Sequence, residues 1–425
     1  MTIYELSIGI SSGMFDSQLK MLYGSSERNV LRNRARYLSA AERFSRLYPE
    51  CTDVRVFSAG GRAEIGGNHT DHQHGNVLAA AIDADMTAIA ELNGSNEIRI
   101  ASEGFGSFTV NISDMTVIEK GTSAALVKGI IYGLRKKGIE TGGLNVFISS
   151  EIPVGGGLAS SSAFEILIAT IIDGFFGSEN LNPNEIAEVC HSAENDFYGK
   201  NCGIMDQVVC ASGGFILADL VDPSAPLIKK IGFDFGKSGY SLCVTNTSRS
   251  HAGLDAEYDA VCSEMKHIAR EMGYSVLAEA DEEAFFDNIA GLRQKCSDRE
   301  ILRAAHFFGE TKRAVQEAES LENGDTESFF GLVNESGDSS AELLQNLCPT
   351  NCGMHQEIPV AIMLSKRFLE GSGAVKVHGG GFGGSIMAFV PNYRSESYVR
   401  LMNDIFGEGS CRKLNIRPVG GYEMK

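Results

Sequence analysis

The chain has 425 residues, of which 43% are hydrophobic and 22% charged, the balance of a folded globular protein long enough for two domains. Its formal net charge of -18 repels nucleic acid and anionic membrane surfaces, so neither is expected as a partner. An anionic ligand such as a nucleotide would need a local device, namely backbone amides, a helix N-terminus or a metal ion.

The cysteines and the first residues indicate where the protein resides. Ten cysteines occur singly, without a CxxC pair, which favours reduced thiols over a disulfide framework. The segment MTIYELSIGISSGMFD lacks the basic start and apolar core of a signal peptide, and the sequence has no uninterrupted apolar stretch of about 18 residues. We therefore expect a cytoplasmic protein.

The hydrophobic pattern predicts a mixed α and β chain. Residues 1–50 favour helices with a solvated, arginine-rich face, and strand-like runs follow (VRVFSAG, MTAIAEL, EIRIAS and FTVNI). A helix is expected over 123–137, then the strand LNVFISS, then helices over 163–176 and 182–198. Prolines and glycines over 221–237 indicate a domain junction, placed near residue 225, which divides the chain into 1–225 and 226–425. The strand SLCVTNT, a helical region over 254–342 and the strand-turn-strand AVKVHGGGFGGSIMAFV complete the second part.

Two glycine-rich segments are candidates for ligand contact. In IPVGGGLASSSAFEILIATI, three glycines lie just before three serines at the start of an apolar helix, as a phosphate-binding loop requires. A tight strand-to-helix turn is the alternative, because the lysine of a Walker A sequence is missing. The second segment formally satisfies GxGxxG with Gly379, Gly381 and Gly384, but the strand-like SIMAFV follows it instead of a helix. A hairpin is therefore expected, and its turn packs against a ligand or is a plain glycine turn.

A polar segment, GGRAEIGGNHTDHQHG, joins two strand-like runs. It contains Arg62, Glu64, Asn68, His69, Asp71, His72 and His74. Zinc binding is disfavoured, since there is neither a helical HExxH spacing nor a nearby cysteine pair. A hydroxyl-rich ligand fits the density of donors and acceptors better than zinc, and a polar loop without a ligand is the alternative.

Two carboxylates further along the chain are candidates for proton transfer and for metal binding. Asp206, in NCGIMDQ, could accept the proton of a sugar hydroxyl, while Glu194 and Ser162 could hold Mg²⁺ against nucleotide phosphates. Taken singly, each carboxylate could equally be a salt-bridging or capping residue.

Taken together, GRAEIGGNHTDHQHG, IPVGGGLASSSAFE and HGGGFGGS resemble, in order and separation, the three motifs of the sugar-kinase superfamily that includes galactokinase, homoserine kinase, mevalonate kinase and phosphomevalonate kinase. The first segment is similar to the signature of the galactokinase branch, as are CGIMDQ and TNTSRSHAGLDAEY. The resemblance covers residues 54–390. It implies a two-domain α+β GHMP-kinase fold with mixed sheets and flanking helices, an active site between the domains, ATP and Mg²⁺ as cofactors, and phosphorylation of galactose at C1.

The resemblance also implies a role for each matching residue. Arg62 and Asp206 match the catalytic pair, and Ser162 and Glu194 match the Mg²⁺ contacts. The phosphate loop is matched by Gly155, Gly156, Gly157, Leu158, Ala159, Ser160 and Ser161. Positions that line the sugar pocket are matched by His69, Asp71, Gly203 and Tyr258, with Asn68 and His72 at the two places where the sequence departs from the family.

Those two departures leave the sugar open. Galactokinases usually carry Glu where Asn68 stands, reaching the C6 hydroxyl, and Tyr where His72 stands. Losing a carboxylate there makes the pocket less hostile to a C6 carboxylate, and plant galacturonate kinases look similar at this point. The sequence thus predicts a galactose 1-kinase, with a kinase for galacturonate or another C6-modified sugar as the alternative, and with Asn68 and His72 setting selectivity at C6.

A non-catalytic sensor of galactose and ATP is a further alternative, against which the intact Arg62 and Asp206 argue. The polar HTDHQHG segment disfavours a mevalonate-type or homoserine-type kinase. The expected partners are a small sugar and ATP, and the sequence leaves the oligomeric state undetermined.

Overall fold

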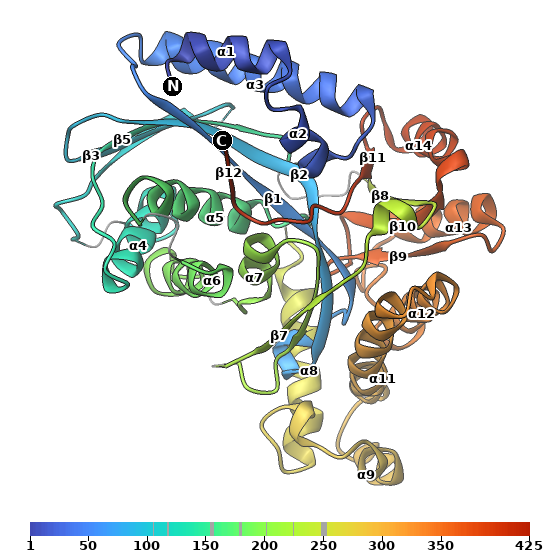
Figure 1. Ribbon diagram of the computed structural model, residues 1–425. Helices are drawn as coiled ribbons and strands as arrows, with labels where there is room; N and C mark the ends of the chain where they lie inside the picture. Colours follow the sequence, from blue (N-terminus) through green and yellow to red (C-terminus); the bar gives the residue numbers. More distant parts are fainter. Residues whose placement is uncertain are drawn as a thin grey trace.

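The computed structural model describes residues 1–104, 106–116, 119–153, 157–177, 181–200, 202–223, 225–247 and 253–425. Within these residues it forms two sheets flanked by helices (Figure 1). Gly155 and Gly156 of the predicted phosphate loop lie outside the described residues, as does part of the TNTSRSHAG segment.

The larger sheet has eight strands and is mixed. Its main path runs β12-β1-β2-β5-β3-β4, with β6 paired to β2 and β7 paired to β6. β3 and β5 are parallel, and the other pairs are antiparallel. The strands are β1 (Val54–Gly66), β2 (Asn76–Leu92), β3 (Glu97–Ser102), β4 (Gly106–Asn111), β5 (Leu144–Ser150), β6 (Phe215–Asp219), β7 (Leu227–Ile231) and β12 (Tyr422–Met424).

Helices cover both faces of this sheet (Figure 1). On one face lie α1 (Ile3–Ser12), α2 (Asp16–Tyr23) and α3 (Glu27–Leu47), whose apolar side chains form a core with β1 and β5. The helices predicted for residues 1–50 are thereby confirmed, and their role is to bury this face of the sheet. The other face carries α4 (Ser123–Lys136), α5 (Ser160–Ile172), α6 (Pro183–Ser192) and α7 (Met205–Ser212) around the largest core cluster.

α5 is the most apolar of these helices. The stretch Ser160–Gly177 is long and apolar enough to cross a membrane, and 61% of it is buried inside the fold. It packs between β1, β2, α6 and α7, as the core helix of a globular protein does.

The smaller sheet has the order β11-β8-β10-β9. Its strands are β8 (Tyr240–Asn246), β9 (Ala374–His378), β10 (Ser385–Pro391) and β11 (Cys411–Leu414). β9 and β10 pair antiparallel, which confirms the hairpin predicted around the second glycine-rich segment. Two helices, α13 (Glu357–Leu369) and α14 (Asn392–Phe406), pack against this sheet in a common core cluster, while α11 (Asp298–Glu322) and α12 (Thr326–Ser339) lie between it and the β1–β2 ribbon.

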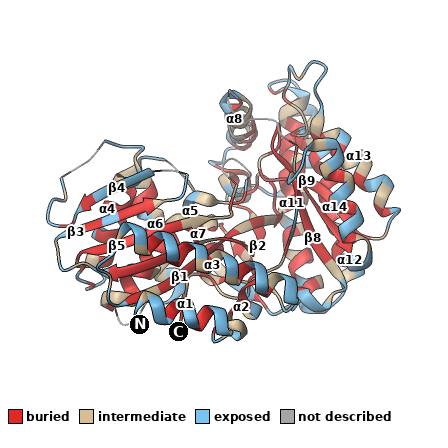
Figure 2. Cartoon of the chain, turned by 90° about the horizontal axis from the view of Figure 1, so that it is seen from above, coloured by how far each residue is buried: buried red, intermediate tan, exposed pale blue. Residues whose placement is uncertain are grey.

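The helical region predicted over 254–342 is divided into several helices. It contains α8 (Asp255–Glu271), α9 (Glu282–Asp287) and α10 (Ile289–Leu292) before α11 and α12, and the first three form a small core with α11. Viewed from above, the two sheets occupy opposite sides of the molecule (Figure 2). The boundary near residue 225 stays a prediction. β6 and β7 on its two sides are paired, and β12 returns the C-terminus to the larger sheet.

Candidate active site

The centre of the site is an ion pair between β1 and α7. Arg62 donates from Nε to Asp206 Oδ1 at 2.8 Å and from Nη2 to Oδ2 at 3.0 Å, a bidentate arrangement that fixes both planar groups. Asp206 lies in the first turn of α7, where a carboxylate is favoured by the helix dipole. Burial disfavours the charged guanidinium, yet the carboxylates of Asp206 and Glu64 raise the pKa of Arg62 above its ordinary value. Arg62 is therefore cationic at every relevant pH.

Arg62 also binds the end of the predicted phosphate loop. Its Nη1 donates to the carbonyl of Gly157, and its backbone N–H donates to the carbonyl of Leu158 at 3.2 Å. A register shift in the β1–β2 pairing lies between Gly60 and Arg62, and such bulges commonly redirect side chains at active sites. One guanidinium thus connects the predicted catalytic carboxylate with the loop that precedes α5.

The loop ends at Ala159, directly before the N-terminus of α5. Ala159 adopts the left-handed conformation (φ 56°) and makes no side-chain cap, so no side chain of the described residues takes up the free amides of the first turn. Ser160 and Ser161 occupy this turn, and Ser162 is buried. An uncapped helix N-terminus preceded by small residues suits an anion such as a phosphate.

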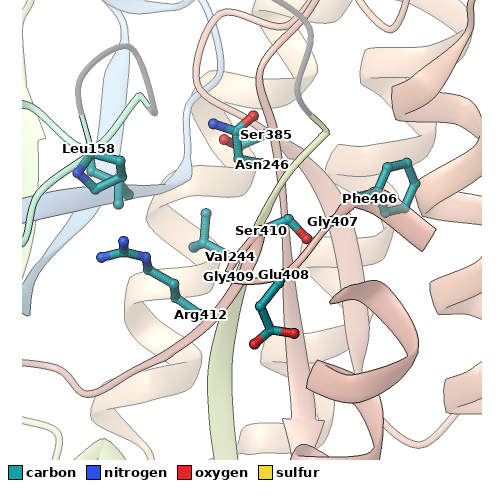
Figure 3. A pocket seen from close by; sticks show the side chains of 11 residues that line it. Leu158, Val244, Asn246, Ser385, Phe406, Gly407, Glu408, Gly409, Ser410 and Arg412 are labelled. Atoms are coloured by element: carbon teal, nitrogen blue, oxygen red, sulfur yellow. The ribbon is translucent and has the colours of Figure 1, made fainter. Parts of the chain in front are cut away.

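Leu158 lies between this centre and a cavity of about 380 Å³ (Figure 3). Asn246, Ser385 and Arg412 line this cavity together with residues 406–410. The carbonyl of Leu158 holds Arg62 while its side chain borders this space. Leu158 therefore connects Arg62 with this cavity.

Glu194 occupies a buried turn that continues α6. Its carboxylate accepts hydrogen bonds from Lys200 Nζ at 2.8 Å, Cys202 Sγ at 3.0 Å and Gln207 Nε2 at 2.7 Å. Gln207 follows Asp206 directly, so this carboxylate is tied to the same turn of α7 as the Arg62–Asp206 pair. The ammonium of Lys200 forms an ion pair with this carboxylate.

A second buried carboxyl group, missed by the sequence analysis, lies beside Glu194. Glu165 accepts from Gln207 Nε2 at 3.2 Å, and its Oε1 has no partner among the described residues. Burial, helped by the negative charge of Glu194, raises the pKa of Glu165 to about 8. Gln207 Nε2 therefore joins the carboxyl groups of Glu165 and Glu194.

Asn68 is fully engaged by the protein. Its Nδ2 donates to Glu64 Oε1 at 2.8 Å and to the carbonyl of Gly379 at 2.7 Å, and its Oδ1 accepts from Asn346 Nδ2 at 2.8 Å. An amide has only two N–H groups, and the side chain is 1% exposed, so no donor remains for a sugar. The predicted contact of Asn68 with C6 stays a prediction. In the structure this amide connects Glu64 of β1 with Gly379 and Asn346.

The glycine turn between β9 and β10 offers three successive carbonyls, two of which contact the polar segment of Asn68 and His69 and the third Tyr258 of α8. Beside the Gly379 carbonyl held by Asn68, the Gly380 carbonyl lies 2.9 Å from His69 Nε2, and the Gly381 carbonyl accepts from Tyr258 Oη at 2.9 Å. The left-handed φ of Gly381 (77°) and the Asn346 carbonyl oxygen, which would lie 2.3 Å from a Cβ at this position, leave no room for a larger residue. The first and third motifs are thus fastened together across the two sheets.

The other predicted sugar contacts surround this junction. The His69 ring stacks on Tyr258 at 6.5 Å and meets His72 edge-on at 5.7 Å. Burial lowers the pKa of His72 to about 4, and its Nε2 has no partner among the described residues. Asp71 and Gly203 are exposed. His69, His72 and Tyr258 therefore lie together.

Glu310 of α11 binds the backbone of the polar segment that contains Asn68. Its Oε1 accepts from the backbone N–H groups of Gly67 at 3.1 Å and Asn68 at 3.3 Å. His306 Nε2 donates to the Asn68 carbonyl at 2.9 Å. Burial opposes the charge of Glu310, but the Lys376 ammonium at 3.6 Å holds its pKa at about 2. Sequence reasoning missed Glu310 because nothing local in an amphipathic helix distinguishes it from an exposed glutamate.

Comparison with known proteins agrees with this geometry. A family model described as GHMP kinases N terminal domain matches residues 125–214, and one described as Galactokinase galactose-binding signature matches residues 42–92. The galactokinase of Clostridium acetobutylicum is 30% identical over 371 residues, which cover 84% of this chain and 89% of that protein. The chain belongs to the galactokinase family. The galactokinase of Clostridium tetani is 27% identical over 383 residues, covering 89% of this chain and 94% of that protein.

Solved structures place this galactokinase family member in the GHMP-kinase fold. The crystal structure of Lactococcus lactis galactokinase complexed with galactose has a TM-score of 0.76 at 23% identity and covers 91% of this chain and 99% of its own. A mevalonate kinase has a TM-score of 0.61 at 19% identity, with 85% and 99% covered. The predicted α+β fold is confirmed. Both residues of the central ion pair fall within the regions that the family models match.

Proposed function

We propose that the protein transfers the γ-phosphoryl group of ATP to the C1 hydroxyl of galactose and so forms galactose 1-phosphate and ADP. Membership of the galactokinase family supports a sugar kinase, and the likeness to a galactokinase complexed with galactose supports this sugar. One observation carries the proposal. Arg62 binds the Asp206 carboxylate and the Gly157 carbonyl at once, so a group that can orient a hydroxyl and a loop that can hold a phosphate meet there.

In the proposed reaction, Asp206 receives the proton that the C1 hydroxyl loses as its oxygen bonds to phosphorus. The bidentate guanidinium of Arg62 holds this carboxylate in one orientation. Arg62 also lies where negative charge collects on the transferring group, because it is anchored to the phosphate loop. Phosphoryl transfer depends on positioning and charge neutralisation more than on early deprotonation, so both residues contribute.

The nucleotide phosphates are proposed to bind at the phosphate loop, formed by Gly155, Gly156, Gly157, Leu158, Ala159, Ser160 and Ser161. Support comes from the uncapped first turn of α5, whose amides point toward its N-terminal side. Ser162 and Glu194 are proposed to hold Mg²⁺, which when bound neutralises phosphate charge. The ammonium that Glu194 already binds supports a cation site there.

The sugar is proposed to lie against His69, Asp71, His72, Gly203 and Tyr258. A polar floor made by rings and a short turn suits a ligand rich in hydroxyl groups. The case for galacturonate depended on the missing carboxylate at position 68. In the structure the Glu64 carboxyl group lies 2.8 Å from the Asn68 amide, so an acidic side chain is retained at this place, which favours galactose.

The test is turnover with product identification. The purified protein is incubated with ATP, Mg²⁺ and galactose, and the products are followed by ADP release and ³¹P NMR. The proposal requires one galactose 1-phosphate for each ADP, with no turnover when Mg²⁺ is removed by a chelator. Phosphate on O6, or sugar and ATP binding without turnover, would contradict it, and the second result would favour a sensor.

A further inference from the structure

Glu64 is a carboxylate of β1 to which the sequence analysis gave no role. From Arg62 to Glu64 the pairing of β1 with β2 is regular, with Arg62 facing Ala81 and Glu64 facing Ala79, and register shifts lie on either side of this stretch. Side chains alternate along a strand, so Glu64 points to the same side as Arg62, about 7 Å farther along the strand. The intervening Ala63 faces the core and is fully buried, whereas Glu64 is half-buried.

The Glu64 carboxylate is fixed by one of its oxygens only. Oε1 accepts from Asn68 Nδ2 at 2.8 Å, and Oε2 has no hydrogen-bond partner among the described residues. The Glu64 backbone N–H donates to His378 Nε2 at 3.2 Å, which holds the strand against β9. The group is therefore oriented, with one acceptor oxygen left for a ligand.

The Asn68 amide cannot bind a ligand in place of Glu64. Glu64 Oε1 and the Gly379 carbonyl are acceptors, so the amide must turn both N–H groups toward them, and its oxygen accepts from Asn346. Asn68 orients the carboxylate, and Glu64 presents the free oxygen.

The charges around this oxygen favour a neutral ligand. The guanidinium of Arg62 is paired with Asp206, and the Lys376 ammonium lies against Glu310 and the Ile65 carbonyl. Asp71 adds a second negative charge near Glu64. A sugar hydroxyl can donate to Glu64 Oε2, whereas an anionic sugar would bring oxygens without a proton toward the carboxyl groups of Glu64 and Asp71.

We propose that Glu64, positioned by Asn68, is the specificity-determining residue of the sugar subsite: it accepts a hydrogen bond from a sugar hydroxyl remote from C1 and excludes uronic acids. This inference rests on the proposed sugar kinase activity. It assigns selectivity to a residue of β1 instead of to Asn68 and His72.

The experiment measures both binding and turnover for galactose and galacturonate. Dissociation constants come from calorimetry without nucleotide, and kcat/KM comes from ADP release. The variants are Glu64→Gln, which removes the charge but keeps an oxygen for Asn68, and Glu64→Asp, which keeps the charge on a shorter side chain. Glu50→Gln, an exposed glutamate before β1, is the matched control.

Glu64→Gln should weaken galactose binding and narrow the preference of galactose over galacturonate by about tenfold or more, the loss expected for a hydrogen bond to a charged group. Glu64→Asp should retain the exclusion of galacturonate, and Glu50→Gln should match the parent. An unchanged preference in Glu64→Gln, or an equal loss for both sugars, would overturn the inference. A parent protein that binds galactose selectively without phosphorylating it would contradict the proposed function and leave the binding test of Glu64 decisive.

Discussion

The raised pKa of Glu165 can be tested through the pH dependence of the free energy of unfolding. The side chain is fully buried on α5, one oxygen has no partner among the described residues, and the other accepts from Gln207. Burial and the charge of Glu194 raise its pKa from 4.5 to about 8. Between these values the folded chain retains a proton that the unfolded chain releases. The free energy of unfolding therefore falls as the pH rises through this window.

The magnitude follows from the width of the window. Each pH unit within it costs about 1.4 kcal/mol, so from pH 5.5 to 7.5 Glu165 lowers the free energy of unfolding by about 2 to 3 kcal/mol. Glu165→Gln cannot ionise and lacks this dependence. The variant should therefore gain about 2 to 3 kcal/mol relative to the parent between the two pH values.

The assay is urea denaturation of parent and variant at pH 5.5 and 7.5 in metal-free buffer. Every other titrating group is common to both proteins, so the difference between them isolates Glu165. The control Glu50→Gln should show no such change. If the difference between parent and Glu165→Gln were the same at both pH values, Glu165 would be ionised in the folded protein and the reasoning would fail.

Two further substitutions test the surroundings of the site. Asn68→Ala removes three hydrogen bonds at the junction of the first and third motifs. Urea denaturation should show a free energy of unfolding lower by about 3 kcal/mol. A loss below about 0.5 kcal/mol would show that stability does not depend on the junction. Lys200→Met removes the ammonium that pairs with Glu194 and that would compete with a metal ion for this carboxylate. The Mg²⁺ concentration needed for half-maximal turnover should therefore fall severalfold. A higher Mg²⁺ requirement would mean that Lys200 assists metal binding.

Local elements were predictable wherever sequence pattern and burial coincide. The helix predicted over 123–137 is α4 (Ser123–Lys136), and the strand LNVFISS is β5 (Leu144–Ser150). The helix predicted over 182–198 begins with the expected Asn182 cap but ends as α6 at Ser192, after which a wider turn carries Glu194. Helical periodicity alone does not distinguish the two kinds of turn, so the change at this functional position could not be predicted.

Long-range contacts set the limit of prediction within the site. The motifs and their family resemblance singled out Arg62 and Asp206, although 144 residues separate them. By contrast, Asn68 was assigned to the sugar from its position in a motif, while its partner Gly379 lies 311 residues away. Whether an amide faces a ligand or a distant carbonyl depends on how the two sheets meet, which a single sequence does not contain.

Turnover of Asp206→Asn with galactose tests the central claim most directly. The amide keeps the size of the side chain but can neither accept the proton nor hold Arg62 with two anionic oxygens. We predict that kcat falls by about 10² or more while ATP binding, measured by calorimetry, is nearly unchanged. Near-parental kcat in Asp206→Asn would contradict the assignment of the Arg62–Asp206 pair as the catalytic centre.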